Sequence, residues 1–454
     1  MRSPSNDPMT RDEKRAGASL AAIFGLRMLG LFLILPVFAE HARHIPGGDS
    51  MTLVGLAMGA YGLTQAMFQI PFGMASDRVG RKPVIVAGLL LFAFGSAVAA
   101  LADDIWMVIL GRVLQGAGAI SAAVTALAAD LTREQHRTKV MAMIGSSIGL
   151  VFAASLVGAP ALYSVVGMSG IFWLTAGLAI GAIGLVTHVV PSAPPAEPGP
   201  KVPFRTVLMD GQLMRLNFGI FSLHLIQMAM FVVVPGLLVS TGGLALDRHW
   251  MVYLGTMLLS LVPLVPAIIQ AERHGRHKPV FLGAVALLFV AEIGSLFGRG
   301  SFAAIVAMIW VFFVAFNILE ASLPSLISRI APPRAKGAAL GVYNTSQALG
   351  LFAGGALGGW LAQHEGAAGV FALGAAVALV WFVVAGSMRP PPVIVGRELP
   401  LAAGVDAETV RAQLAGLPGV REVSLSPESR MAYLRVDLDQ WDERRARQFA
   451  GGEA

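Results

Sequence analysis

The sequence predicts an all-α membrane protein with twelve transmembrane helices in two six-helix bundles, followed by a small C-terminal α+β domain. The first observation is composition: the 454 residues are 56% hydrophobic and only 13% charged, with a mean hydropathy of +0.70. Soluble globular proteins carry about 25% charged residues. The apolar residues form continuous runs rather than alternating with polar ones, which favours membrane helices over the strands of a membrane barrel.

The second observation is the length of these runs, since a helix needs about 20 mainly apolar residues to cross a bilayer. They cover residues 18–40, 51–76, 84–102, 105–131, 140–164, 167–190, 213–241, 249–271, 278–298, 301–327, 336–362 and 366–388. Residues 191–203 hold six prolines, a composition typical of an extended linker. The expected domains are a first bundle (1–190), a cytoplasmic linker (191–212), a second bundle (213–390) and a cytoplasmic domain (391–454).

The third observation is the distribution of lysine and arginine. The N-terminal segment, the linker region and the loops after the second, fourth, eighth and tenth runs each hold at least three. The opposite loops hold only Arg43, Arg248 and Arg299. Because basic residues accumulate in cytoplasmic loops, we expect both termini in the cytoplasm of a cell whose inner (plasma) membrane holds the chain.

The most informative segment, residues 73–83 (GMASDRVGRKP), joins the second and third runs. Gly73 allows two helices to approach closely, Asp77 lies at the membrane face, and Gly80 provides a tight turn. A basic cluster that cannot cross the bilayer is formed by Arg78, Arg81 and Lys82. A weaker copy at residues 272–279 suggests that the two bundles are parallel repeats, although short basic loops can also match by chance.

Ionisable side chains inside membrane helices are candidate functional groups, because they are costly unless they are paired or hydrated. Glu320 in the tenth run and His224 in the seventh are candidates for binding and releasing a proton. Arg112 in the fourth run could hold an anionic substrate or assist proton coupling. Each could instead stabilise packing between helices. Glu292 and Glu40 lie near helix ends, where we expect them to reach the interface.

Other polar residues are expected to line a substrate cavity or to join neighbouring helices by hydrogen bonds. Tyr61, Gln65 and Gln69 recur every four residues on one face of the second helix, and Asn344 and Gln347 share a face of the eleventh. The complete set of cavity candidates is Arg27, Tyr61, Gln65, Gln69, Gln227, Asn317, Asn344 and Gln347.

Together these features resemble the major facilitator superfamily. Residues 73–83 are similar to its signature G-x-x-x-D-R-x-G-R-[RK], and residues 112–118 are similar to its fourth-helix signature. Gly145, Gly149, Gly158 and Pro160 resemble its antiporter signature and would pack closely, although Ala159 replaces the usual glycine before the proline. The whole chain, tail included, is most similar to the YajR-type proton-driven efflux transporters.

The resemblance implies a monomeric secondary transporter that exports small molecules or drugs in exchange for protons by alternating access. Its partners would be a small-molecule substrate, protons and the lipid bilayer, without nucleic acid. It also implies a cytoplasmic latch in which Asp77 meets the positive N-terminus of the eleventh helix and Arg81 contacts Asp130. The latch residues are Gly73, Asp77, Arg78, Gly80, Arg81 and Asp130.

Two other functions stay open from the sequence. The chain could be a proton symporter or uniporter for uptake, or a membrane sensor that signals through its C-terminal domain. An enzyme is not expected, because the sequence contains no nucleotide-binding loop, metal-ligand cluster or nucleophile constellation.

The tail from residue 397 is more polar and shows both helix and strand periods. A helix capped by Asp406 would bury Val410 and Leu414 on one face, and alternation around Leu434 predicts a strand. With strands at 393–399 and 420–425 and a last helix capped by Asp439, the order β-α-β-β-α resembles a ferredoxin-like module. Similar metal-associated domains bind metal through paired cysteines, and the absence of cysteine means that we expect neither a metal nor a cofactor.

Overall fold

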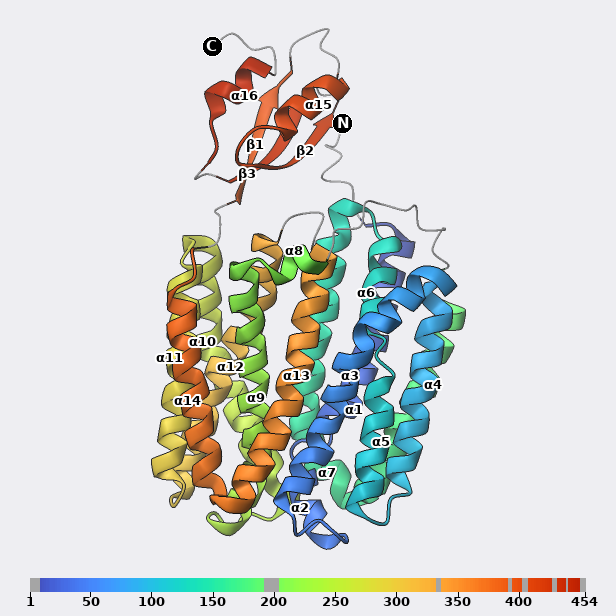
Figure 1. Cartoon of the computed structure of the whole chain (residues 1–454), viewed down its shortest axis with the longest axis vertical. Coiled ribbons are helices and arrows are strands. Elements are labelled where there is room, and N and C mark those ends of the chain that lie inside the picture. The colour runs from blue at the N-terminus through green and yellow to red at the C-terminus, as the bar shows by residue number, and fades with distance from the viewer. Residues whose placement is uncertain are drawn as a thin grey trace.

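The computed structural model describes residues 9–191, 204–331, 336–390, 394–401, 407–426, 431–437 and 440–449. Long helices run side by side in one bundle, and a small module containing the three strands lies beyond one end of it (Figure 1). The short helix α8 (Phe204–Leu208) lies at that same end. The basic loops mark this end as cytoplasmic.

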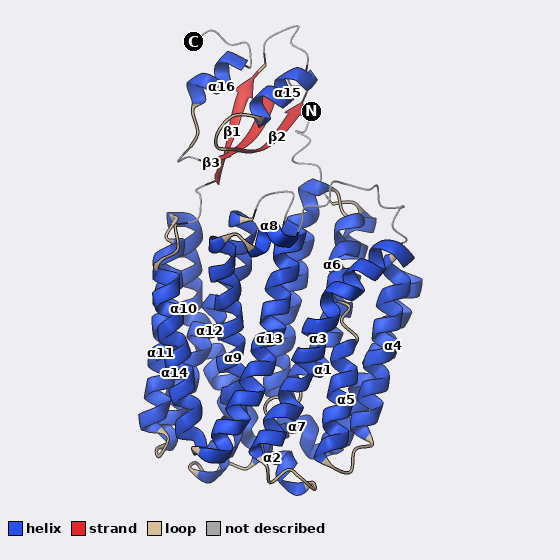
Figure 2. Cartoon of the chain, viewed as in Figure 1, coloured by secondary structure: helices blue, strands red, loops and turns tan. Residues whose placement is uncertain are grey.

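Helices account for nearly all of the bundle (Figure 2). The long ones are α1 (Arg11–Phe32), α3 (Met51–Val79), α4 (Arg81–Ala100), α5 (Ile105–Ala117), α6 (Ser121–Asp130), α7 (Glu134–Gly184), α9 (Gly211–Ser240), α10 (His249–His274), α11 (His277–Gly298), α12 (Phe302–Ile330), α13 (Lys336–His364) and α14 (Gly366–Gly386). Short helical turns are α2 (Phe38–His41), η2 (Ala42–His44), η3 (Leu185–Val189) and η4 (Leu246–Arg248).

Ten helical segments in the described part of the chain are long and apolar enough to cross a membrane. One of them, Lys139–Val189, covers most of α7, whose 51 residues are interrupted at Gly167, where φ is 66° and ψ is −174°. Helix α13 has 29 residues but is not among the ten. Its middle carries the polar run Asn344–Gln347, which lowers its mean hydropathy.

Local sequence explains where several helices begin and end. Thr10 caps α1 by accepting a hydrogen bond from the backbone N–H of Glu13, which starts this helix well before the expected residue 18. The expected helix 105–131 is divided into α5 and α6 at Gly118. A Cβ at Gly118 would lie 2.3 Å from the carbonyl oxygen of Gly88, so the missing side chain lets the chain at this break lie against α4.

Glycines bring α3 and α13 into backbone contact near the end of the bundle opposite α8. A Cβ on Gly55 would lie 2.1 Å from the carbonyl oxygen of Gly355, and one on Gly355 would lie 2.4 Å from that of Gly55. The backbone N–H of Met51 donates to Oε1 of Gln363 at 2.6 Å. Helices α3 and α13 therefore pack tightly at the end of the bundle opposite α8.

A glycine with positive φ occupies the loop of the sequence repeat in each half, although the two backbone conformations differ in ψ, which is 153° at Gly80 and 12° at Gly275. Gly80 lies between α3 and α4 with φ of 105°, and Gly275 follows α10 with φ of 67°. Both values lie in the left-handed region that glycine adopts without strain.

A lysine contact is also repeated. Lys82 donates from Nζ to the carbonyl oxygen of Val190 at 2.6 Å. In the second half, Lys278 donates to the carbonyl oxygens of Gly386 at 2.9 Å and Met388 at 2.6 Å. In each half the lysine near the start of the third helix joins the chain that follows the sixth, which supports the interpretation of parallel repeats.

The expected close packing at the fifth-helix glycines is wrong for this structure. A Cβ added to Gly145, Gly149 or Gly158 meets no atom of the described residues within 4 Å. These glycines leave one face of α7 open instead of drawing a neighbouring backbone toward it.

The C-terminal module is an antiparallel sheet with strand order β1-β3-β2 and two helices. Its elements are β1 (Ile394–Pro400), α15 (Ala407–Ala415), β2 (Val420–Ser426), β3 (Met431–Asp437) and α16 (Glu443–Phe449). Val410, Leu414 and Leu434 are buried in its core, as predicted. Asp442 caps α16 by accepting from the backbone N–H of Arg444 at 3.0 Å. The predicted caps Asp406 and Asp439 lie outside the described residues.

Candidate functional site

The first candidate cluster joins three helices of the second half. His224 on α9 is buried, with 2% of its surface exposed. Its Nε2 lies 2.7 Å from Nε2 of Gln347 on α13 and 4.0 Å from Oε2 of Glu320 on α12. The sequence proposes these residues separately, and the fold brings them together.

Hydrogen bonds assign the proton on His224. Its Nδ1 lies 3.2 Å from the carbonyl oxygen of Ile220, which can only accept, so Nδ1 carries the proton. In the neutral ring Nε2 is then an acceptor, and the Gln347 amide donates to it. If Nε2 gains a proton, Gln347 must turn its oxygen toward the ring. The amide therefore responds to the protonation state of the histidine.

Glu320 is the unsatisfied member of this cluster. Its side chain is 27% exposed, but Oε2 is buried and has no hydrogen-bond partner among the described residues. Tyr343 on α13 is buried, and its hydroxyl also lacks a partner among them. Asn317, one turn before Glu320, donates to Oγ of Ser260 at 2.9 Å. A network that only joins helices would be expected to satisfy these buried polar atoms with hydrogen bonds. The described residues leave them without such bonds, which favours a site that binds a proton or a ligand.

Two further cavity candidates have simpler surroundings. Gln227 is buried on α9, and neither atom of its amide has a partner in the described part of the chain. Asn344 is half-buried on α13.

The second candidate cluster lies in the first half, around Tyr61 on α3. The guanidinium carbon of Arg27, on α1, lies 5.5 Å from the centroid of the Tyr61 ring, and that of Arg112, on α5, lies 4.9 Å from it. All three side chains are buried. Arg112 therefore lies with Arg27 and Tyr61, on other helices than Glu320 and His224, and its role in substrate binding or proton coupling stays a prediction.

Polar neighbours orient the two arginines. Arg27 donates to Oγ of Ser121 at 2.7 Å. Arg112 donates to Oε1 of Gln115 at 2.7 Å, and the Gln115 amide donates to Oγ of Ser96 at 2.7 Å.

Gln65 and Gln69 are buried farther along α3, as their shared spacing with Tyr61 predicts. Oε1 of Gln65 and both amide atoms of Gln69 have no partner among the described residues. This face of α3 therefore carries buried polar groups that the described residues leave without hydrogen-bond partners.

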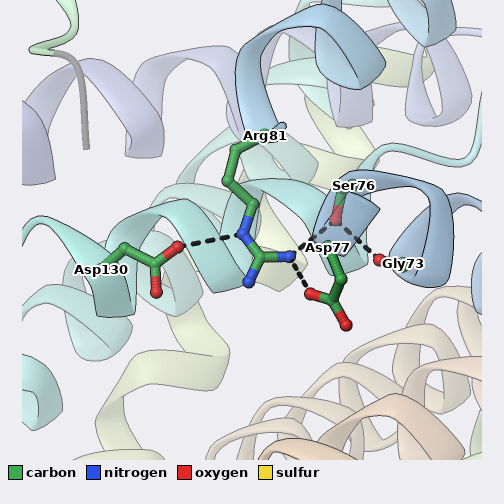
Figure 3. Close-up of polar contacts among 5 residues, drawn as sticks. All are labelled: Gly73, Ser76, Asp77, Arg81 and Asp130. Atoms are coloured by element: carbon green, nitrogen blue, oxygen red, sulfur yellow. Dashed lines mark hydrogen bonds and ion pairs between the residues drawn. The ribbon is translucent and has the colours of Figure 1, made fainter. Parts of the chain in front are cut away.

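At the cytoplasmic end, Arg81 joins three elements (Figure 3). Its Nε donates to Oδ2 of Asp130, at the end of α6, at 3.0 Å, and its Nη1 donates to Oγ of Ser76 at 2.8 Å. Nη1 also pairs with Asp77. Oγ of Ser76 donates in turn to the carbonyl oxygen of Gly73 at 2.7 Å. The arginine thus ties the start of α4 to the ends of α3 and α6.

The other residues expected in the latch, Gly73, Arg78 and Asp77, have different outcomes in the structure. A Cβ on Gly73 would lie 3.3 Å from Cβ of Ala122 on α6, so this glycine does allow close approach. Arg78 is exposed, and no contact joins it to Arg81 or Asp130 within the described ranges. The contact of Asp77 with the N-terminus of the eleventh helix stays a prediction, because residues 332–335 lie outside the described residues.

The second half carries a related ion pair that the sequence did not predict. Nη2 of Arg329, near the end of α12, lies 2.6 Å from Oε2 of Glu272, near the end of α10. Arg329 also donates to Oγ of Ser325 at 3.3 Å. The pair joins α10 to α12, whereas Arg81 and Asp130 join α4 to α6, so the two halves do not use equivalent positions for these ion pairs.

The expectation that Glu292 reaches the membrane interface is wrong. Its side chain is 2% exposed. A Cβ on Gly374 of α14 would lie 2.3 Å from its Oε2, so the missing side chain at this glycine makes room for the carboxyl between α11 and α14. Glu40 is half-buried and pairs with Arg43 at 3.4 Å.

Several site residues went unrecognised in the sequence. Ser121 and Ser96 carry no signal, because serine is common in membrane helices. Tyr343 could have been found, since it directly precedes the polar run that begins at Asn344. Among the described residues there is no group of three or more histidine, aspartate or glutamate side chains that could hold a metal ion.

Comparison with known proteins places this arrangement in a family. The model of the Major Facilitator Superfamily matches residues 18–271 and 249–427. The inner membrane transport protein YajR of Escherichia coli is 47% identical over 435 residues, which cover 94% of this chain and 95% of that protein. The multidrug resistance protein MdtH of Proteus mirabilis is 29% identical over 353 residues, which cover 74% of this chain and 84% of that protein.

A solved structure supports the fold. The inward-facing, occupied form of a bacterial homolog to the human lysosomal transporter Spinster aligns with a TM-score of 0.67 and 12% identity, covering 84% of this chain and 98% of that chain. At this identity the likeness concerns the fold alone. On the family match and its close relative, this chain is a multi-pass inner membrane transport protein, not an enzyme, and it belongs to the Major Facilitator Superfamily.

Proposed function

We propose that the chain is a proton-coupled antiporter that exports small molecules or drugs by alternating access. The observation that carries this proposal is the Glu320 cluster, in which a buried carboxyl oxygen without a hydrogen bond from any described residue lies 4.0 Å from Nε2 of His224. Carboxyl and imidazole groups inside membrane helices are the usual carriers of transported protons. The similarity to MdtH, which is named a multidrug resistance protein, supports export of drugs.

Protonation would change the charge of this cluster. With Glu320 protonated, the cluster is neutral and Gln347 can keep its hydrogen bond to His224. When Glu320 loses the proton, an unpaired negative charge in this place is unfavourable. It is relieved by water, or by protonation of His224 with rotation of Gln347. Ionised Glu320 therefore favours a conformation in which water reaches the cluster. Proton release is in this way coupled to the change between the two transporter states.

The proposal includes a finer architecture. The ten apolar segments, α13, and the division of α7 at Gly167 together give twelve spans. We assign residues 1–190 and 213–390 to the two bundles, 191–212 to the linker and 391–454 to a ferredoxin-like domain, a type that the strand order β1-β3-β2 supports. The transporter would act as a monomer.

The test of this function starts from a panel of drug-susceptibility assays in a pump-deficient host. A drug to which the chain confers resistance is then added to proteoliposomes that contain the purified protein and a pH-sensitive dye. Antiport predicts proton movement opposite to the drug, and a protonophore should abolish drug accumulation. Counterflow that does not respond to the proton gradient would instead favour the uniport alternative.

The latch is a separate part of the proposal. Arg81 stabilises one arrangement of α3, α4 and α6 by contacts that do not involve the Glu320 cluster. We assign it to the balance between outward- and inward-facing states and not to substrate binding.

Replacing Arg81 with lysine is expected to reduce transport several-fold while leaving the protein folded. A lysine cannot contact Asp130 and Ser76 with the fixed geometry of a guanidinium, and a hydrogen bond to a charged group contributes about 1.5–3 kcal/mol. Drug resistance and the melting temperature are measured together. Arg205→Gln, an exposed arginine on α8, serves as the control. Unchanged resistance in Arg81→Lys would show that the latch does not limit transport.

Deletion of residues 397–454 distinguishes transport from sensing. The module has its own core, and the Glu320 cluster lies entirely within the bundle. An antiporter is therefore expected to keep at least about half of its transport rate, because no part of the proton site is removed. Transport is measured in proteoliposomes at matched protein content. If the deletion abolishes a cellular response to a ligand and that loss does not follow from a change in transport, the sensor function would be supported instead.

A further inference from the structure

We propose that the Arg27–Tyr61–Arg112 cluster is the binding site for an anionic group on an organic substrate. The inference deepens the proposed function, on which it rests, by naming the substrate class. It starts from the burial of two permanent positive charges: Arg27 is 2% exposed and Arg112 is 0% exposed.

Neither cation is balanced by an acid in the described part of the chain. The ion pairs formed by described residues do not include Arg27 or Arg112, and their hydrogen-bond partners, Ser121 and Gln115, are neutral. A buried charge without a partner costs several kcal/mol. Unlike lysine or histidine, arginine does not relieve this cost by losing a proton. An anion that is not part of the described residues would supply the missing negative charge.

The unsatisfied atoms indicate where an anion would bind. Each arginine uses Nη1 in a hydrogen bond, whereas Nε and Nη2 have no partner among the described residues. Nε and Nη2 form one edge of a guanidinium, which can donate two parallel hydrogen bonds to a carboxylate, sulfonate or phosphate. Both arginines leave this same edge available. We expect this feature in a site for an oxyanion, because each arginine can then donate two hydrogen bonds to the anion.

The Tyr61 ring lies beside both guanidinium groups. Both guanidinium carbons lie within 5.5 Å of its ring centroid, and its hydroxyl also lacks a partner among the described residues. The ring contacts Phe92 edge to face, with centroids 6.4 Å apart. An apolar, aromatic wall beside two cations suits an organic anion better than a free, fully hydrated phosphate ion.

The site is closed to solvent in this structure, since Arg27, Tyr61 and Arg112 are all buried. It lies on α1, α3 and α5, whereas the Glu320 cluster lies on α9, α12 and α13. Substrate and proton would therefore bind in opposite halves of the transporter. Each would shift the equilibrium between the same outward-facing and inward-facing states.

The test is calorimetric titration of the full-length protein in detergent with three probes. Benzoate presents a carboxylate on an aromatic ring, benzylamine presents a cation of similar size, and inorganic phosphate presents a free oxyanion. The variants are Arg27→Gln and Arg112→Gln, with Arg299→Gln, an exposed arginine at the periplasmic end, as the matched control. Elution as a single peak in size-exclusion chromatography checks the folding of each variant.

We expect saturable binding of benzoate, none of benzylamine, and at least tenfold weaker benzoate binding in each cluster variant but not in the control. A tenfold loss corresponds to about 1.4 kcal/mol. Arg112→Lys should recover only part of the affinity, because it keeps the charge but not the bidentate edge. Absence of benzoate binding, equal binding of benzylamine, saturation by phosphate alone, or full affinity in both cluster variants would each overturn the proposal. Binding in detergent needs no proton gradient, so this test and the tests of proton coupling fail independently.

Discussion

Replacement of Glu320 with glutamine is expected to abolish proton-coupled export. The substitution keeps the size of the side chain and removes its ability to gain or lose a proton. Since Glu320 provides the carboxyl oxygen beside His224 that no described residue hydrogen-bonds, substrate-driven proton movement in proteoliposomes should fall more than about tenfold. Drug resistance in the pump-deficient host should fall with it.

Substrate exchange separates coupling from general damage. Counterflow of labelled substrate without a gradient should persist in Glu320→Gln, because the arginine cluster of the first half is unchanged. Glu365→Gln, an exposed glutamate before α14, is the matched control and should retain coupled transport. Substrate-driven proton movement of normal size in Glu320→Gln would refute the assigned role.

The second large effect is expected for Gly355→Leu. A Cβ at this position would lie 2.4 Å from the carbonyl oxygen of Gly55, and a backbone atom cannot rotate away. Overpacking of this kind typically costs about 1–3 kcal/mol or more. The cost applies to the state in which α3 and α13 touch, so the variant should be driven toward periplasmic opening and should lose most transport.

Gly283→Leu provides the comparison, because Gly283 is exposed on α11 and a Cβ there meets no described atom within 4 Å. Transport is measured for both variants, together with labelling from the periplasmic side of a cysteine placed at Leu53. The native chain contains no cysteine, so labelling has no background. Normal transport by Gly355→Leu would show that the backbone contact is not required during the cycle.

The membrane class and most helices could be predicted because they depend on composition and run length. Their interruptions were harder, since they depend on tertiary contacts. Gly118 separates α5 from α6 at a point where the backbone of Gly88 on α4 lies against it. Gly167 interrupts α7 with a non-helical backbone conformation. Neither position differs in sequence from the other glycines in this glycine-rich chain.

For the candidate sites, too, the local features could be predicted from the sequence, whereas the features that depend on tertiary contacts could not. Burial of a charged residue is visible in an apolar run, so Glu320, His224, Arg27 and Arg112 could be identified individually. Their grouping depends on which helices are neighbours, and the sequence alone does not show that Arg112 lies beside Arg27 and Tyr61. Pairs such as Arg329 with Glu272 depend on geometry at helix ends, where many charges lie and periodicity gives no guide.

The central claim is that the protonation state of Glu320 sets the balance between the two transporter states. Spin labels at Val79, the last residue of α3, and Met209, just before α9, report this balance at the cytoplasmic end, since both side chains are exposed. Their distance distribution is measured by double electron–electron resonance in acidic and in mildly alkaline buffer. We expect the distribution to shift with pH in the native background and to remain in one state at both pH values in Glu320→Gln. The same pH-dependent shift in Glu320→Gln would contradict the account.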